Sequence, residues 1–281
     1  MPAPPNSGPP ISAPPRLFDR GLHRKRLDRA ARRYAQADFL KRRAAQDVAW
    51  RLEPIMRNFG VAVDLAARTG VFAEALADSE AASRVGLLIE ADLSAAMLAG
   101  RAGARLVADE EHLPFADQSL DLVVSTLALH WTNDVVGALI QIRRALRPDG
   151  LFIGAFLGGA TLTELRQSLV AAETEILGGA GSRVSPFADA ADAASLLQRA
   201  GFVQPVADID RVTVTYAHPL KLLADLRQMG ETSVLADRHP RALTRTLLAR
   251  ASEIYAERFA ADDGRVPATF EILTLTGWTA A

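Results

Sequence analysis

The sequence of 281 residues contains no cysteine. This absence excludes a disulfide framework, a thiolate zinc site, an iron–sulfur cluster and a cysteine nucleophile. An excess of charge of one sign is also lacking, because 32 Lys and Arg are balanced by 33 Asp and Glu for a net charge of −1. Without a net positive field the chain is not expected to bind nucleic acid.

Long apolar runs are missing as well. No stretch reaches the roughly 18 residues that a membrane-spanning helix needs. The first residues lack the apolar segment of a signal peptide and the arginines of a transit peptide. We therefore expect a cytoplasmic chain of bacterial type without a transmembrane segment, built as one large domain with an appendage.

The N-terminal region differs from the rest in composition. Residues 1–16 are rich in proline and small polar residues, which predicts a disordered tail. Residues 16–43 contain eleven Lys and Arg against three Asp and Glu, a local net charge of +8. Residues 17–59 are expected to form a basic helical segment or lid. Its charge is interpreted either as a solvated helical face or as a surface for an acidic partner or peripheral membrane contact.

From residue 60 onward, short apolar runs alternate with helical patterns. This order is typical of βαβ units, which build a parallel sheet that helices cover on both faces. The expected strands are residues 61–65, 85–89, 104–108, 120–125 and 151–156. The expected helices are residues 38–59 with an internal kink at Pro54, 71–77, a short one after Ser94, and 134–146. Residues 147–150, Arg-Pro-Asp-Gly, predict a turn.

The second half of this domain, which we place at residues 60–281, shows a different pattern. The expected helices are residues 161–177, 189–200, 219–229 and 240–259, with a helical insertion around 217–260. Residues 203–216 alternate loosely and predict two strands. Residues 268–278 predict a last strand that returns to the same sheet.

Acidic side chains stand at or just after the ends of the first three predicted strands. Asp64 precedes a turn of small residues that closes at Gly70, Asp92 follows the second strand, and Asp109 follows the third. Ligands of open α/β sheets bind beyond the carboxyl ends of the strands, where these carboxylates could accept ribose hydroxyls and an adenine amino group. Each one alone is equally explained as a cap or turn residue, whereas the ordered set favours a nucleoside site.

Longer motifs carry a family resemblance. The series VDLAARTG, ADLSAAML, ADEEHLPFADQSLDLVVSTLALHW and RALRPDGLFIGAF resembles class I S-adenosylmethionine-dependent methyltransferases. More narrowly, LFDRGLHRKR, LALHWTND, RVSPF, LLQRAGF, DLRQMGE and DGRVPATF resemble the mitochondrial complex I assembly-factor family, related to the biotin-pathway carboxyl methyltransferases. The resemblance runs from residue 17 to 278. It implies a Rossmann-like α/β fold with seven mostly parallel strands in the order 3-2-1-4-5-7-6, the last strand being antiparallel.

The resemblance also implies an S-adenosylmethionine site. Asp64, Ala66, Arg68 and Gly70 would form the first loop against the methionine part, and Asp92 would hold the ribose hydroxyls. The other implied cofactor contacts are Leu93, Met97, Asp109, Glu110, Ser125 and the lid residue Tyr34.

The first loop departs from the family pattern D-x-G-x-G-x-G. Ala66 and Arg68 stand at the first two glycine positions, and only Gly70 remains. Glycine there permits positive φ and a close backbone approach to the ligand. Ala66 is expected to be tolerated with a negative φ. The Arg68 cation is unfavourable beside a sulfonium unless it turns outward to pair with the cofactor carboxylate.

Three functions follow from the pattern and the resemblance. The first is methyl transfer from S-adenosylmethionine to a protein or carrier-bound substrate, linked to complex I assembly, with His130 and Trp131 as the candidate catalytic pair. In the alternative, Trp131 packs and His130 caps a loop. The second function, which the narrow family implies, is hydroxylation of an arginine on a complex I subunit, and the third is a non-catalytic assembly factor. The five histidines form no His-x-Asp/Glu pair, so no metal site is predicted.

Overall fold

The computed structural model describes residues 16–187, 190–238 and 243–281. Its seven-stranded sheet has the order β3-β2-β1-β4-β5-β7-β6, which confirms the predicted fold class and strand order. The strands are β1 (Phe59–Leu65), β2 (Val85–Asp92), β3 (Ala104–Val107), β4 (Leu120–Thr126), β5 (Leu146–Leu157), β6 (Val203–Tyr216) and β7 (Val266–Trp278). β1 to β5 pair in parallel, and β7 is antiparallel to both β5 and β6. The predicted disordered tail lies almost wholly outside the described residues.

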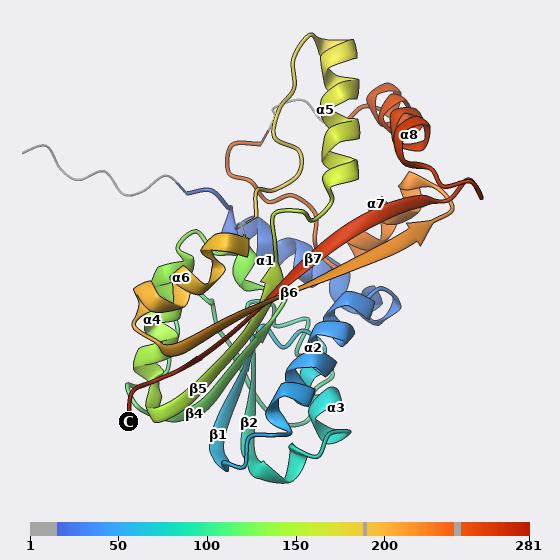
Figure 1. The fold of residues 1–281 in the computed structure, drawn as a ribbon. Helices are drawn as coiled ribbons and strands as arrows, with labels where there is room; N and C mark the ends of the chain where they lie inside the picture. Colours follow the sequence, from blue (N-terminus) through green and yellow to red (C-terminus); the bar gives the residue numbers. More distant parts are fainter. Residues whose placement is uncertain (1–15, 188–189, 239–242) are drawn as a thin grey trace, which may run out of the picture.

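Helices cover both faces of the sheet, as Figure 1 shows. The α-helices are α1 (Arg20–Ala30), α2 (Phe39–Leu52), α3 (Val71–Ala77), α4 (Val135–Ala145), α5 (Thr163–Leu177), α6 (Ala190–Ala200), α7 (Pro219–Gln228) and α8 (Arg245–Phe259). Short 3-10 turns are η1 (Ala31–Gln36), η2 (Ala82–Arg84) and η3 (Leu129–Trp131). Within the described ranges, no helix combines the length and apolar character needed to cross a membrane.

The alternation of side chains along β4 explains why its three central residues, Leu122 to Val124, are all apolar. Leu122 and Val124 pack with α2 and α3 on one face, and Val123 packs with α4 and α6 on the other. A central parallel strand buries both of its faces, so every position prefers an apolar residue.

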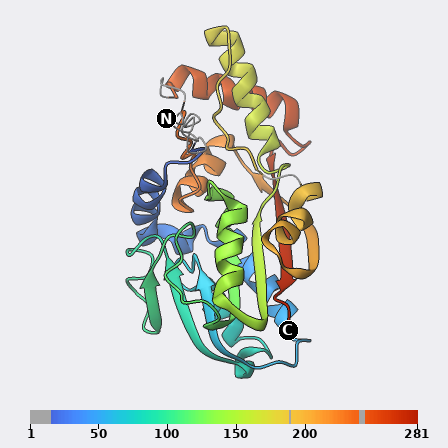
Figure 2. The same cartoon turned by 90° about the vertical axis from the view of Figure 1, so that its left-hand side faces the viewer.

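A third layer lies beyond the carboxyl ends of β4 and β5. There α5, α7 and α8 pack with Leu127, Leu157 and the first half of β7 in a separate apolar cluster. Figure 2 shows α5 and α8 at one end of the molecule, above the sheet. The N-terminal segment reaches the same end, where Phe18 forms a β-bridge with Leu235.

Several local predictions were wrong for identifiable reasons. The helix predicted to run to residue 59 ends at Leu52, and Pro54 follows its end instead of kinking it, since proline lacks the N–H that would continue the helix. Residues 203–216 form one strand because β7 pairs with β6 from one end to the other. The turn at 147–150 is a bulge inside β5, where the pairing with β4 shifts register.

Two helix predictions also changed. The chain after Ser94 forms successive turns and no helix. α8 begins at Arg245 rather than at 240, which lies outside the described residues, as does the predicted start at 189.

Candidate active site

The carboxyl ends of β1, β2 and β4 meet at one edge of the sheet. The register aligns Asp64 with Val124 of β4 and with Glu90 of β2, and Leu65 with Ser125. The side chains of Asp64, Asp92 and Ser125 are all fully buried. The structure therefore brings together the acidic residues that the sequence places after separate strands.

Several oxygens at this edge have no hydrogen-bond partner among the described residues. They are both carboxylate oxygens of Asp64, the hydroxyls of Ser125 and Thr126, and Oε1 of Glu110. Buried polar atoms are normally paired, and an unpaired one costs about 1–3 kcal/mol. These acceptors fit a ligand that brings hydroxyl and amino donors, as an adenosyl amino acid does.

In contrast to Asp64, both carboxylate oxygens of Asp92 have hydrogen-bond partners. Its Oδ2 accepts hydrogen bonds from Arg68 Nη1 at 2.8 Å and from the Arg68 backbone N–H at 2.9 Å. Its Oδ1 accepts from the Ser94 backbone N–H at 2.8 Å, which is the local capping role that the sequence left open. Burial of the Arg68 guanidinium opposes its charge, but the neighbouring Asp92 raises the pKa of Arg68 above its usual value.

The first loop keeps the left-handed backbone geometry of the glycine pattern, although Ala66 and Arg68 replace two of its three glycines. The φ angles are +68° at Ala66, +56° at Arg68 and +84° at Gly70. The condition under which Ala66 was expected to be tolerated, a negative φ, is therefore not met, because the turn imposes left-handed geometry on the residue that occupies it. The outward turn, which was the condition for Arg68 to be compatible with a sulfonium, is not found either. The Arg68 side chain is only 1% exposed and turns inward, because Asp92 is a buried charge that needs a partner.

The predicted adenine carboxylates are held by the N-terminal segment. Arg20 at the start of α1 donates from Nη2 to Asp109 at 2.7 Å and also to Glu110. Burial works in the opposite direction, but the hydrogen bond from Arg20 lowers the pKa of Asp109 below its usual value. Asp109 also accepts from the Glu111 N–H, consistent with the turn role considered from sequence.

Lys41 of α2 is a site residue that the sequence analysis missed. Its buried Nζ donates to the carbonyl oxygens of Ala66 and Thr126, both at 2.6 Å. Burial lowers the pKa of Lys41 to about 8 and raises that of Asp64 to about 7. A signal was available, because Lys41 lies on the buried face of α2 with Ala44, Ala45 and Val48 at helical spacing.

Three other predicted cofactor contacts are core residues near this edge. Tyr34 is buried, and burial raises its pKa. Leu93 and Met97 belong to the same apolar cluster as Tyr34 and Leu27. These side chains join the N-terminal segment to the sheet.

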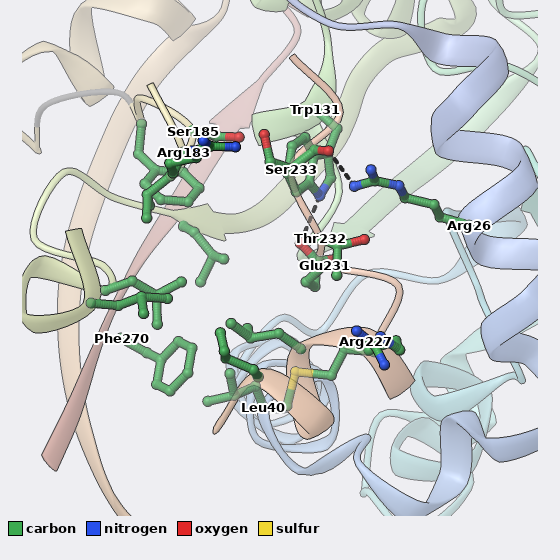
Figure 3. A pocket seen from close by; sticks show the side chains of 18 of the residues that line it. Arg26, Leu40, Trp131, Arg183, Ser185, Arg227, Glu231, Thr232, Ser233 and Phe270 are labelled. Carbon is green, nitrogen blue, oxygen red and sulfur yellow. Dashed lines mark hydrogen bonds between the residues drawn. The ribbon is translucent and has the colours of Figure 1, made fainter. Parts of the chain in front are cut away.

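A pocket of about 570 Å³ opens beside this edge, toward the third layer. Its walls are mainly apolar, and Figure 3 shows Phe270 and Leu40 across from Trp131 and Glu231. Tyr34 and Lys41 line its inner end. Four guanidinium groups also contribute to its lining, those of Arg26, Arg183, Arg227 and Arg238.

Glu231 links the predicted catalytic pair to this pocket. Its Oε2 accepts from Trp131 Nε1 at 2.6 Å and lies 3.1 Å from His130 Nε2 (Figure 3 draws the Trp131 bond). The Leu157 N–H donates to His130 Nδ1 at 3.4 Å, so Nε2 carries the proton and donates to Glu231. The sequence analysis included Glu231 in a family motif, DLRQMGE, but gave it no role. The packing alternative also holds for Trp131, which contacts Phe18 and His23.

Within the described ranges, His, Cys, Asp and Glu side chains do not gather in groups of three or more that could hold a metal ion.

The sequence is similar to two groups of known proteins and to one domain family. A methyltransferase domain model matches residues 63–154. The human protein "Arginine-hydroxylase NDUFAF5, mitochondrial" is 40% identical over 269 residues, which cover 93% of this chain and 76% of the relative. A malonyl-[acyl-carrier protein] O-methyltransferase of Halorhodospira halophila is 34% identical over 269 residues, with 93% and 88% coverage.

The solved structures agree with this fold. The crystal structure of a candidate methyltransferase from Bacillus halodurans superposes with a TM-score of 0.55 at 15% identity, covering 84% of this chain and 99% of its own. The resemblance stated from the sequence motifs is thereby confirmed at both the broad and the narrow level. The chain belongs to the methyltransferase-fold family that contains the NDUFAF5 arginine-hydroxylases and the malonyl-[acyl-carrier protein] O-methyltransferases.

Proposed function

We propose that the chain binds S-adenosylmethionine at the carboxyl ends of β1, β2 and β4 and transfers its methyl group to a protein or carrier-bound acceptor. The observation that carries the proposal is the position of the pocket. Tyr34 and Lys41 line it, and Lys41 Nζ donates to the carbonyl oxygen of Thr126 at the end of β4, whose hydroxyl is unpaired. The pocket is also lined by residues of α5, α7 and α8. An acceptor on a long arm could therefore reach the cofactor edge while its carrier stays outside.

The chain's own residues would divide the cofactor between them. Asp64 and Ser125 offer acceptors to the amino acid and its amine, Lys41 offers the charge that a carboxylate needs, and Asp92 would hold the ribose once Arg68 leaves it. The bound cofactor supplies an electrophilic methyl group. Methyl transfer then depends mainly on alignment of the acceptor and on removal of one proton.

Glu231 is the residue best placed to serve the acceptor. Both hydrogen bonds found for its carboxylate in the described structure go to Oε2, so Oε1 is available to the acceptor group. With His130 and Trp131 fixing its orientation, Glu231 can hold a cationic group or accept its proton. We assign His130 and Trp131 to positioning this carboxylate.

The 40% identity with an arginine-hydroxylase over 93% of the chain supports a second candidate, in which the acceptor is an arginine side chain that becomes hydroxylated. This reaction inserts one oxygen atom and would require an external oxidant, such as dioxygen together with a two-electron reductant. The Glu231 carboxylate suits a guanidinium equally well under either chemistry. The link to complex I assembly, implied by the narrow resemblance, is part of both proposals, as is the complex I subunit as protein substrate.

One experiment separates these functions. A complex I subunit is isolated from cells with and without this protein, and its peptides are weighed by mass spectrometry. Methyl transfer adds the mass of one methylene group to a residue, hydroxylation adds one oxygen atom, and an unchanged mass would contradict both for that subunit. Calorimetry with S-adenosylmethionine tests the cofactor directly, and no heat of binding with folded protein would overturn the first proposal.

A further inference from the structure

Arg68 occupies the position where the ribose is expected. Its guanidinium lies on Asp92 at 2.8 Å, and both side chains are almost completely inaccessible to solvent. Asp92 therefore cannot bind two ribose hydroxyls while this pair is intact, since Oδ2 is bonded to Arg68 and Oδ1 to Ser94.

The backbone conformation at position 68 favours glycine, so the turn alone does not account for an arginine there. A glycine at position 68 would adopt the φ of +56° without strain, whereas an arginine adopts it at a cost. Strained residues of this kind persist where surrounding contacts determine them, and they concentrate at functional sites. The contact that holds Arg68 is the ion pair with Asp92.

A second arginine repeats the arrangement at the other end of the nucleoside site. Arg20 pairs with both Asp109 and Glu110, and it is carried by α1, an element separate from the sheet. Two guanidinium groups thus neutralise the acidic residues expected to face ribose and adenine. The Nη2 atom of Arg68 has no hydrogen-bond partner among the described residues, so Asp92 satisfies only part of the Arg68 guanidinium.

We propose that Arg68 is an internal counter-ion that determines the affinity of the nucleoside site, and that a nucleoside binds only by displacing it from Asp92. Arg20 plays the same part at the adenine end. This inference rests on the proposed cofactor site and adds a specificity-determining residue to it.

The charge of the ligand gives this proposal a signature. S-adenosylmethionine carries a sulfonium cation, and S-adenosylhomocysteine has the same nucleoside with a neutral sulfur. A guanidinium retained near the site disfavours the sulfonium form more than the neutral one. Removing the charge at position 68 should therefore tighten binding of both ligands, and of S-adenosylmethionine more.

The test is calorimetric titration of both ligands into the full chain and three variants. Arg68→Gln removes the charge and keeps most of the bulk, Arg68→Lys keeps the charge, and Arg43→Gln breaks an exposed ion pair with Asp210 as the matched control. We expect Arg68→Gln to bind S-adenosylmethionine about tenfold more tightly than the wild type. Arg68→Lys and Arg43→Gln should stay close to the wild type.

Two results would overturn the inference. One is Arg68→Gln binding no more tightly than the wild type. The other is an equal gain for the two ligands, because bulk and not charge would then close the site. If Arg68→Gln does not fold, Arg20→Gln tests the adenine end with the Asp92 pair intact, and it should give a smaller gain.

Tight wild-type binding that equals Arg68→Gln would leave the cofactor proposal standing and refute this one, whereas no binding by any folded variant would refute the cofactor proposal itself.

Discussion

The two ends of the candidate active site differ in how they are filled. At the end proposed for the nucleoside, carboxylates of the sheet edge are paired with Arg68 and Arg20, and the Arg68 and Asp92 side chains are almost inaccessible to solvent. At the acceptor end, apolar side chains and Glu231 surround a pocket of about 570 Å³. Ion pairs therefore occupy the carboxylates at one end of the site, while an open pocket lies at the other end.

The largest effect is expected from breaking the ion pair at the nucleoside end. Asp92→Asn leaves the Arg68 charge buried without a partner, which should lower the free energy of unfolding by about 3–5 kcal/mol. Urea unfolding measures the loss. Asp210→Asn, which breaks the exposed pair with Arg43, should cost at most about 1 kcal/mol. Equal losses in the two variants would show that the buried pair has no special weight.

At the acceptor end, Glu231→Gln should have the next largest effect. It removes the charge that accepts from Trp131 and His130, and charge-assisted hydrogen bonds contribute about 1.5–3 kcal/mol. Product formation should fall by about tenfold or more, with S-adenosylmethionine affinity nearly unchanged. Glu175→Gln removes a surface carboxylate paired with Arg250 and should leave activity as it is. A fall in cofactor affinity alone would place Glu231 at the wrong end of the site.

The pH dependence of stability tests Asp64. Burial raises its pKa from 3.8 to about 7, so between these values the folded state binds a proton that the unfolded state has lost. The free energy of unfolding should therefore fall as pH rises through this range, by at most about 1.4 kcal/mol per pH unit, and Asp64→Asn should abolish this contribution.

Asp121 supplies a control of opposite sign. Burial opposes ionisation there, but the Val61 N–H and Arg147 lower its pKa. Its contribution is present above its unfolded pKa and is lost on acidification, so Asp121→Asn should weaken the protein at neutral pH. A parallel response of the two variants in urea titrations would contradict the assignment of Asp64.

A smaller effect is expected from filling the pocket. Leu226→Trp on α7 should reduce turnover about tenfold, because the acceptor arm loses its space, while cofactor affinity changes little. Leu220→Trp on the same helix lies at a 45% exposed position and should leave turnover unaffected. Unchanged turnover in Leu226→Trp would mean that the acceptor takes another route.

The sheet was predictable from sequence because its information is local. The apolar runs around Val123 and Ile153 are long enough to mark strands. Asp64 and Asp92 stand at the carboxyl ends of β1 and β2. The carboxyl edge follows from the parallel order alone. Element ends were less predictable, as Pro54 and the bulge in β5 show, because they depend on pairing between strands.

The contacts that define the site were not predictable in the same way. Arg68 and Asp92 are 24 residues apart, and Glu231 is 100 residues from Trp131. No periodicity relates such positions, and the inward turn of Arg68 follows from burial of a charge that only the folded chain creates. The burial of Lys41 could have been predicted from the sequence, because a lysine on the apolar face of a helix indicates a buried cation.

The β-bridge between Phe18 and Leu235 gives the N-terminal segment a mechanical role. It is reinforced by the Asp19 N–H donating to Val234 O and the Ala236 N–H donating to Leu17 O, so α1 and the stretch just after Glu231 are joined. A movement of the α1 backbone that accompanied release of Arg20 from Asp109 would be transmitted through these bonds to the stretch that follows Glu231. Binding of the cofactor would then change the position of Glu231 in the acceptor pocket. The order in which cofactor and acceptor bind would follow from this connection.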